Sequence, residues 1–324
     1  MNTFGRKFRI SIFGESHGAA LGVCVDGCPA GLALQPADFA GDLRRRRAGT
    51  RGTTLRLEDD APELLSGVLD GATTGAPIAI IFRNANTRSG DYADVLRTPR
   101  PGHADFVAQR KFGGFADYRG GGHFSGRLTL GLVAAGVVAK KVLGSVAVSA
   151  AIVELGGVKF GEHDAALNAA IAEGDSLGGL IECTVANLPV GWGEPFFDSV
   201  ESLISHLVFA IPGIRGVEFG SGFAAARQRG SEHNDALVAA SGATATNHAG
   251  GVNGGISNGN ALCFRVAVKP TASISRVQQT FDMELGELGT LAVRGRHDIC
   301  FALRVPVVLE AATAIALADL QLLA

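Results

Sequence analysis

Glycine most constrains what this chain can fold into, because it makes up 45 of the 324 residues. Glycine accepts positive φ angles and lets a backbone approach a ligand closely. The glycines gather in short runs, such as residues 120–122, 250–251 and 254–255, and follow no fixed period. The pattern therefore argues against low-complexity segments and solenoid repeats, and favours glycine-rich site loops on a rigid scaffold.

Apolar segments with strand or helix periodicity lie between these loops. The expected strands are residues 7–13, 21–25, 64–69, 78–82, 146–153, 180–188 and 261–268. The expected helices are residues 36–47, 126–143, 198–209 and 306–323, with another beginning just after His103. Because no Pro/Ser-rich linker or charge run marks a boundary, we expect one α/β (α+β) domain spanning residues 1–324.

Composition narrows the class of protein further. A net charge of -2 argues against a general nucleic-acid binder, which needs a broad cationic surface. The first residues, with Arg6, Lys7 and Arg9, lack the apolar core of a signal peptide, and no uninterrupted apolar run reaches about 18 residues. We expect a cytoplasmic protein that does not bind membranes. Five scattered cysteines without a CxxC pair predict free thiols.

Two short motifs each contain one histidine. The sequence Gly-Glu-Ser-His-Gly at residues 14–18 falls in the turn between the first two strands, where His17 could exchange protons near neutral pH. The sequence Pro-Gly-His-Ala-Asp at residues 101–105 places His103 just before a helix. Taken alone, the His17 motif fits an incidental surface-turn histidine better than a functional one. The His103 motif fits an incidental histidine beside a helix cap made by Asp105 at least as well as a functional one.

Two basic segments indicate an anionic ligand. Residues 44–51 hold five arginines, whose guanidinium groups pair with phosphate or carboxylate, and Gly49 and Gly52 favour a binding loop over a solvated helix face. In residues 117–127, backbone N–H groups, Ser125 and Arg127 could converge on a phosphate at a helix start. This segment is neither a Walker A loop nor a dinucleotide-binding turn, and it suggests a phosphate-bearing cofactor.

The C-terminal third adds a second polar cluster, at residues 247–259 and 269–273, and the sequence Gly-Arg-His-Asp at residues 295–298. Asp298 is a candidate base or a helix cap, and Arg296 a candidate anion ligand. A hydrolase triad of Ser16, His103 and Asp298 would lack the GxSxG nucleophile elbow. A metal site using His17, His103 and His297 would lack local ligand spacing. We set both aside.

These blocks, from the Gly14 turn to Asp298 and in this order, resemble those of the chorismate synthase family. The resemblance implies a βαβα sandwich and a homotetramer. It also implies a carbon–oxygen lyase that eliminates phosphate from 5-enolpyruvylshikimate 3-phosphate to give chorismate. That anti-1,4-elimination requires reduced FMN without net redox change. Whether NADPH or an external reductant reduces the flavin stays open.

The resemblance also implies roles for individual residues. His17 matches the histidine that protonates the reduced flavin, His103 the one that assists the departing phosphate, and Asp298 the aspartate near flavin N5. The implied flavin contacts are His123, Phe124, Ser125, Pro212, Gly213, Gly254, Lys269, Pro270, Thr271, Ala272, Ser273 and Arg296. The implied substrate or NADP contacts are Arg46, Arg47, Arg51 and Arg127.

The chain departs from the usual family pattern at several positions. His123 and Phe124 stand where Arg-Ser is usual, and Ala48, Ile299 and Ala302 replace prolines. Two other readings of the sequence remain: a phosphate-binding lyase or transferase without flavin, and a nucleic-acid or protein-binding module. The net negative charge and the scarcity of aromatic residues argue against a nucleic-acid or protein-binding module. Flavin titration would distinguish a flavin-free lyase or transferase from a flavin-dependent enzyme.

Overall fold

The computed structural model describes residues 2–92, 94–293 and 295–324. It contains two five-stranded antiparallel sheets. The N-terminal sheet has the order β1 (Thr3–Phe4), β2 (Arg9–Gly14), β3 (Ala20–Asp26), β7 (Ile78–Arg83) and β4 (Glu63–Leu64). The C-terminal sheet has the order β11 (Ile214–Phe219), β14 (Leu262–Val268), β10 (Gly179–Ala186), β8 (Ala147–Leu155) and β9 (Val158–Lys159).

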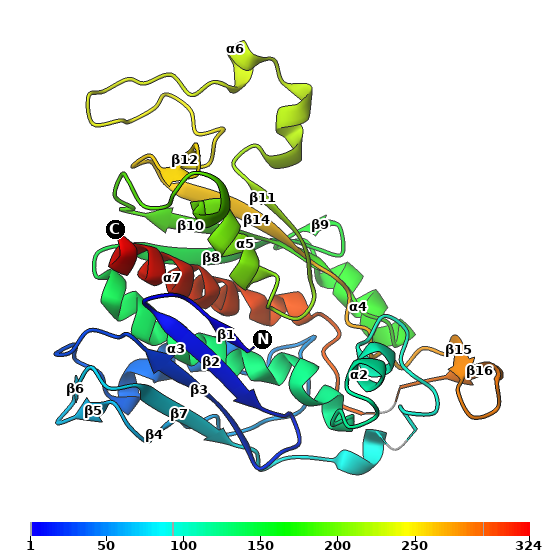
Figure 1. Cartoon of the computed structure of the whole chain (residues 1–324). Coiled ribbons are helices and arrows are strands. Elements are labelled where there is room, and N and C mark those ends of the chain that lie inside the picture. The colour runs from blue at the N-terminus through cyan, green and yellow to red at the C-terminus, as the bar shows by residue number, and fades with distance from the viewer. Residues whose placement is uncertain (1, 93, 294) are drawn as a thin grey trace.

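A layer of helices fills the space between the two sheets (Figure 1). Its centre is α3 (Thr129–Leu143) and α7 (Val305–Leu323), which pack side by side, α3 on the N-terminal sheet and α7 on the C-terminal sheet. Both helices are apolar on nearly every face, as expected for helices buried on all sides. The shorter helices α1 (Ala40–Arg46) and α5 (Val200–Val208) flank this pair.

Helix α7, with the turn before it, is long and apolar enough to span a membrane by length and composition. In this fold, however, 83% of its most apolar window (within Phe301–Leu323) is buried inside the protein. It also carries the buried carboxylate of Glu310, whose oxygens lie 2.6 Å from a nitrogen of Arg45 and 3.0 Å from Lys140 Nζ. Burial raises the pKa of Glu310, but these two cations hold it below its usual value. These contacts make α7 a core helix.

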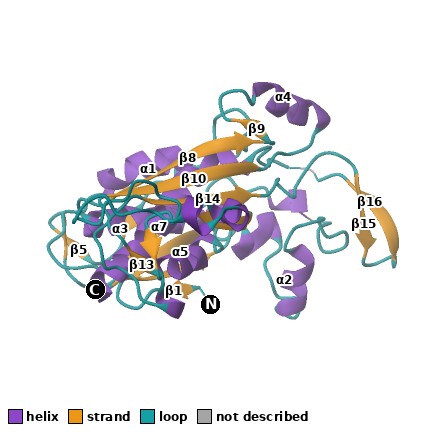
Figure 2. Cartoon of the chain, turned by 90° about the horizontal axis from the view of Figure 1, so that it is seen from above, coloured by secondary structure: helices purple, strands orange, loops and turns teal. Residues whose placement is uncertain are grey.

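Shorter elements complete the chain, and several of them gather at one end of the sheets (Figure 2). That end holds α2 (Asp105–Lys111), α4 (Asp164–Glu173) and the hairpin β15 (Gln278–Asp282) to β16 (Glu287–Leu291). The remaining short elements are α6 (Gly230–His233), β5 (Val68–Leu69), β6 (Ala72–Thr73), β12 (Val252–Asn253) and β13 (Ile256–Ser257). The 3-10 turns are η1 (Pro36–Phe39), η2 (Ser89–Tyr92), η3 (Arg119–Phe124), η4 (Gly126–Leu128), η5 (Phe196–Asp198), η6 (Gly222–Arg227) and η7 (Phe301–Arg304).

The α+β class expected from the sequence is confirmed, and so are ten of the eleven strands and helices predicted by range, within a few residues at their ends. The single strand expected over residues 64–69 is wrong. The chain instead forms β4 and β5, separated by a bend at Gly67, whose φ of 79° does not fit a regular strand. The periodicity did not reveal α4, β11 or the β15–β16 hairpin.

Candidate active site

A pocket of about 720 Å³ opens where the loops before α3 and α7 meet. Among the described residues that line it, nine side chains are cationic: Arg46, Arg47, Arg56, Arg100, Arg127, Arg215, Lys269, Arg296 and Arg304. Three lining side chains are carboxylates: Glu58, Asp60 and Asp298. An excess of arginine in a concave site attracts a ligand with several negative charges.

The glycine run at residues 120–122 lies between the two motif histidines. Gly120 has a φ of 62°, and a Cβ placed there would lie 2.1 Å from Cε1 of His17. A Cβ at Gly121 would lie 3.4 Å from Nε2 of His103. Glycine adopts this left-handed conformation without strain, and because it has no Cβ it lets the His17 ring pack so closely. Three motifs that are separate in the sequence therefore form one site.

His17 lies behind the pocket wall. Its neighbour Ser16 lines the pocket, whereas the His17 ring is buried against Gly120 and the edge of the Tyr92 ring, with centroids 5.3 Å apart. Burial lowers the pKa of His17, and the positive charges of Arg56 and Arg119 lower it further. Its buried Nδ1 has no hydrogen-bond partner among the described residues. The lowered pKa favours the neutral imidazole, and its Nδ1 is unused among the described residues.

His103 lies directly on the pocket and is held by a carboxylate. Its Nδ1 lies 2.7 Å from Oδ1 of Asp105, which Arg100 also contacts at 2.7 Å through Nη2. Burial raises the pKa of Asp105, but the hydrogen bonds from Arg100 and His103 lower it well below its usual value. An ionised Asp105 can only accept a hydrogen bond, so Nδ1 of His103 carries the donated hydrogen, and Nε2 faces Gly121 and the pocket. The carboxylate thus orients His103 and does not cap α2.

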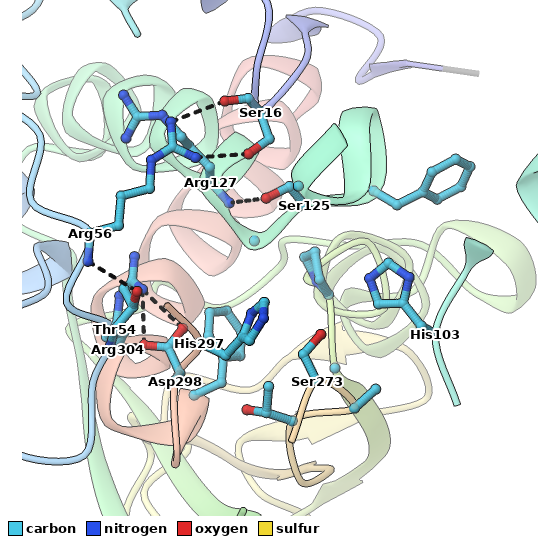
Figure 3. Close-up of a pocket in the computed structure, with 18 of the residues that line it drawn as sticks. Ser16, Thr54, Arg56, His103, Ser125, Arg127, Ser273, His297, Asp298 and Arg304 are labelled. Carbon is cyan, nitrogen blue, oxygen red and sulfur yellow. Dashed lines mark hydrogen bonds and ion pairs between the residues drawn. The ribbon is translucent and has the colours of Figure 1, made fainter. Parts of the chain in front are cut away.

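Asp298 lies across the pocket from His103 (Figure 3). Its two oxygens accept hydrogen bonds from Nη1 of Arg304 at 3.1 and 3.0 Å, and Oδ1 also accepts one from the backbone N–H of Thr54 at 2.9 Å. Arg304 is fixed in turn, because its Nε donates to the carbonyl of Arg46 at 3.1 Å. The carboxylate therefore has one defined orientation on the pocket wall.

The four arginines that the resemblance implied for substrate or NADP fall into three groups. Arg46 and Arg127 line the pocket but are buried, and their guanidinium groups lie 3.6 and 2.9 Å from Asp60. Arg47 lines the pocket with a half-exposed side chain that contacts the Asp59 carbonyl. Arg51 contacts Asn168 and is not among the lining residues.

Most of the implied flavin contacts meet in this pocket. Ten of them line it: Phe124, Ser125, Pro212, Gly213, Lys269, Pro270, Thr271, Ala272, Ser273 and Arg296. His123 instead places Nδ1 2.8 Å from the carbonyl of Gly14, and Gly254 lies in the β12–β13 turn. Neither of these two is among the lining residues. Their implied roles stay predictions, as do those of the ten.

The chemistry of the lining suits a flavin mononucleotide. Val107, Phe124 and Pro212 offer apolar surface for a flat ring. Lys269 and the buried hydroxyl of Thr271, which has no hydrogen-bond partner among the described residues, offer polar contacts for a phosphate. No group of three potential metal ligands occurs within the part of the chain that the structure describes.

Sequence reasoning missed several lining residues. Arg56, Arg100, Arg215 and Arg304 are single basic residues outside any motif, so nothing in the sequence singled them out. Asp105 was visible within its motif, but the helix that follows it suggested a cap. A His-x-Asp spacing of two residues was the available signal for the contact with His103.

The fold and the pocket define a protein of the α+β class whose cationic cavity suits a small polyanion. The family model described as chorismate synthase matches residues 8–322. The chain is 62% identical over 324 residues to a chorismate synthase of Chitinophaga pinensis, covering 100% of this chain and 97% of that protein. It is 45% identical to a chorismate synthase of Korarchaeum cryptofilum, covering 98% and 96%.

A solved structure described as the crystal structure of chorismate synthase has a similar fold, with a TM-score of 0.75 and 27% identity. The match covers 98% of this chain and 93% of that one. The chain therefore belongs to the chorismate synthase family. It is accordingly an enzyme, a carbon–oxygen lyase.

Proposed function

We propose that this enzyme converts 5-enolpyruvylshikimate 3-phosphate to chorismate by anti-1,4-elimination of phosphate and a ring hydrogen, with reduced FMN. The observation that carries the proposal is the cation-lined pocket with His103 and Asp298 on opposite walls. The substrate has one phosphate and two carboxylates, which suits such a lining. When bound, reduced FMN supplies a transient electron that helps an otherwise poor leaving group to depart.

Arg47 is the best candidate among the four implied arginines for a direct substrate contact. Arg46 and Arg127 direct nitrogens at Asp60 and at neighbouring groups such as Thr129 and Asn84, so few of their donors remain. They would act mainly through the positive potential that they add to the pocket. The half-exposed Arg47 can turn its planar group toward a phosphate or carboxylate.

His103 would act as the general acid for the departing phosphate. Because Nδ1–H donates a hydrogen bond to Asp105, the proton that His103 can give away sits on Nε2, on the pocket side. The same carboxylate stabilises the imidazolium form that must exist before the proton leaves. Donation to a phosphate oxygen lowers the negative charge on the leaving group as the C–O bond breaks.

Asp298 and His17 would handle protons at other positions of the site. Arg304 and Thr54 hold the Asp298 carboxylate in place, and a fixed carboxylate on the pocket surface can accept a proton from a bound molecule. The lowered pKa of His17 favours its neutral form, and its unused Nδ1 would let it exchange a proton from behind the Gly120 wall.

An anaerobic assay with purified protein, substrate and FMN reduced by dithionite tests the proposal. We expect chorismate with reduced FMN, and none with oxidised FMN or without flavin. Equal turnover without flavin would favour the flavin-free lyase instead. Oxidised FMN with NADPH under the same conditions shows whether the protein reduces its own cofactor.

From the same family likeness we propose that the protein is a cytoplasmic homotetramer. Light scattering would measure the mass of the assembly.

A further inference from the structure

Arg56 holds the turn that carries His17. It lies in the irregular segment between α1 and β4, and its Nη1 donates to the Ser16 hydroxyl at 3.0 Å. Its Nη2 donates to the carbonyl oxygen of Ser16, also at 3.0 Å (Figure 3). Ser16 directly precedes His17, so these two bonds fix the backbone from which the histidine side chain starts.

Arg56 is itself oriented by a buried carboxylate. Oε1 of Glu58 accepts from Nε and Nη2 of Arg56 at 3.0 and 2.8 Å. Glu58 also accepts from the backbone N–H groups of Ala85 and Asn86 at 3.0 and 3.2 Å. Burial raises the pKa of Glu58, but the hydrogen bonds from Arg56 and Ala85 and the charge of Arg127 lower it below its usual value, which favours the ionised form. A planar guanidinium held on one side by a carboxylate points its remaining donors in fixed directions.

The same hydrogen-bonded chain reaches the other end of the pocket. Asn86 accepts from Arg296, at 3.0 Å through its side-chain oxygen and at 3.1 Å through its carbonyl. Arg296 belongs to the segment that carries Asp298. Glu58 and Asn86 therefore connect the Arg56 contact with Ser16 to the opposite wall. A rigid hydrogen-bond network of this kind keeps reacting groups at fixed positions relative to one another.

We propose that Arg56 is a positioning residue, which by binding both oxygens of Ser16 holds the His17 turn in the pocket wall. This inference rests on the proposed function, in which His17 handles a proton. Arg56 also affects His17 through its charge. After burial, its positive charge is the largest cause of the lowered pKa of His17; Arg119 lowers it too, Asp117 raises it, and Tyr92 packs against the ring.

The test compares Arg56→Met with Arg56→Lys in the full chain. The first readout is the titration of His17 by NMR in flavin-free protein labelled at histidine, with the signal assigned by its loss in His17→Asn. Arg56→Met should shift the pKa of His17 upward, and Arg56→Lys should leave it closer to the wild-type value. As a control, Arg83→Met removes a surface charge paired with Glu63 and should leave this titration unchanged.

The second readout is turnover with reduced FMN. Arg56→Met should lower kcat by on the order of 10-fold or more with a smaller change in KM, and Arg56→Lys should restore part of the loss. A raised KM at unchanged kcat would make Arg56 a substrate ligand and overturn the inference. So would wild-type kcat and wild-type His17 titration in Arg56→Met.

Two further outcomes are distinguishable. If melting curves show that Arg56→Met does not fold, the kcat of Arg56→Lys decides whether Arg56 positions the His17 turn. Lysine keeps the positive charge but cannot bind both oxygens of Ser16 as the planar guanidinium does, so kcat should still fall. Wild-type kcat in Arg56→Lys then overturns the inference. If the wild-type protein makes no chorismate, the proposed function fails, while the NMR titration still reports whether Arg56 acts on His17.

Discussion

At the scale of single residues, the main finding is that each candidate catalytic group is held by a second side chain. Asp105 orients His103, Arg304 orients Asp298, and Arg56 contacts the turn that carries His17. Such partners restrict a reacting group to one geometry. Mutations at the partner and at the reacting group should therefore have related but separable effects.

His103→Ala should fold and still bind FMN but lose about 100 to 10,000-fold in kcat, the usual contribution of a general acid. His103 contacts Asp105 beside the pocket and fills no core space, so its loss should change the melting temperature little. Melting temperature, FMN affinity and saturated turnover, measured on one preparation, check this. Near-normal turnover in a well-folded variant would leave His103 as a merely structural neighbour of Asp105.

Asp105→Asn should reduce stability in a way that depends on pH. The folded-state pKa of Asp105 is lowered, so its ionised form stabilises the fold above the unfolded value of about 3.9, and this contribution is lost as the pH falls below that value. Breaking a buried ion pair such as Arg100–Asp105 typically costs about 3–5 kcal/mol. Urea unfolding should show a large deficit at pH 7 that shrinks toward pH 3. An equal deficit at both pH values would argue against the ionised pair.

Arg47→Ala and Arg51→Ala form a matched pair, because the resemblance implies both arginines but only Arg47 lines the pocket. Loss of a charge-assisted contact should raise the KM for the phosphorylated substrate in Arg47→Ala by about 10-fold or more. Arg51→Ala should change KM by much less. Steady-state kinetics of both variants decides, and the opposite ranking would show that Arg51 reaches the substrate in the assembled enzyme.

At the scale of helices and strands, α3 and α7 pack closely at the centre of the core. Gly136 lies against Ala311, and a Cβ at Gly136 would be 2.3 Å from the Cβ of Ala311. Gly136→Ala should therefore destabilise the protein by about 1–3 kcal/mol, as overpacked cores do. Gly41, exposed in α1 with nothing near its missing Cβ, is the control: Gly41→Ala should stabilise by about 0.5–1 kcal/mol. Urea denaturation of both variants tests the contrast.

The elements that the sequence predicted well share a clear physical signal. The long helices α3 and α7 are continuous apolar runs, and β14 alternates buried and less buried residues along its length. The elements that were missed lack such a signal: α4 is rich in alanine and polar residues and buries little, and the β15–β16 hairpin lies largely outside the core. Burial produces the periodic pattern, so poorly buried elements escape it.

The residues of the candidate site also divide into those that the sequence identified and those that it did not. Motifs with several unusual residues, such as the one around His17, identified segments that the fold does bring together. Asp105 lies in the same motif as His103, but the other two partners, Arg56 and Arg304, are lone residues more than five positions from the groups that they hold. Their roles depend on tertiary contacts between loops, which periodicity and motif spacing do not encode.

At the scale of the whole molecule, the two sheets share one core. Buried residues from β2 through α7 form a single apolar cluster, with α3 and α7 in its centre. Removing either sheet would expose one face of this helix pair, which is apolar on almost all sides. The pocket, too, takes its walls from segments before α3 and before α7. These contacts support the proposal that residues 1–324 form one domain.

A single domain should unfold in one cooperative step in both halves, and the chain carries a probe for each. Trp192, the one tryptophan in the sequence, is buried on the side of the C-terminal sheet and reports by fluorescence. Cys28, buried just after β3, reports the N-terminal sheet by thiol labelling followed by mass spectrometry of its peptide. Because each sheet needs the shared helices, the two urea midpoints should coincide. Separate midpoints would mean that one sheet keeps a stable core after the other has unfolded, and that the chain contains two folding units.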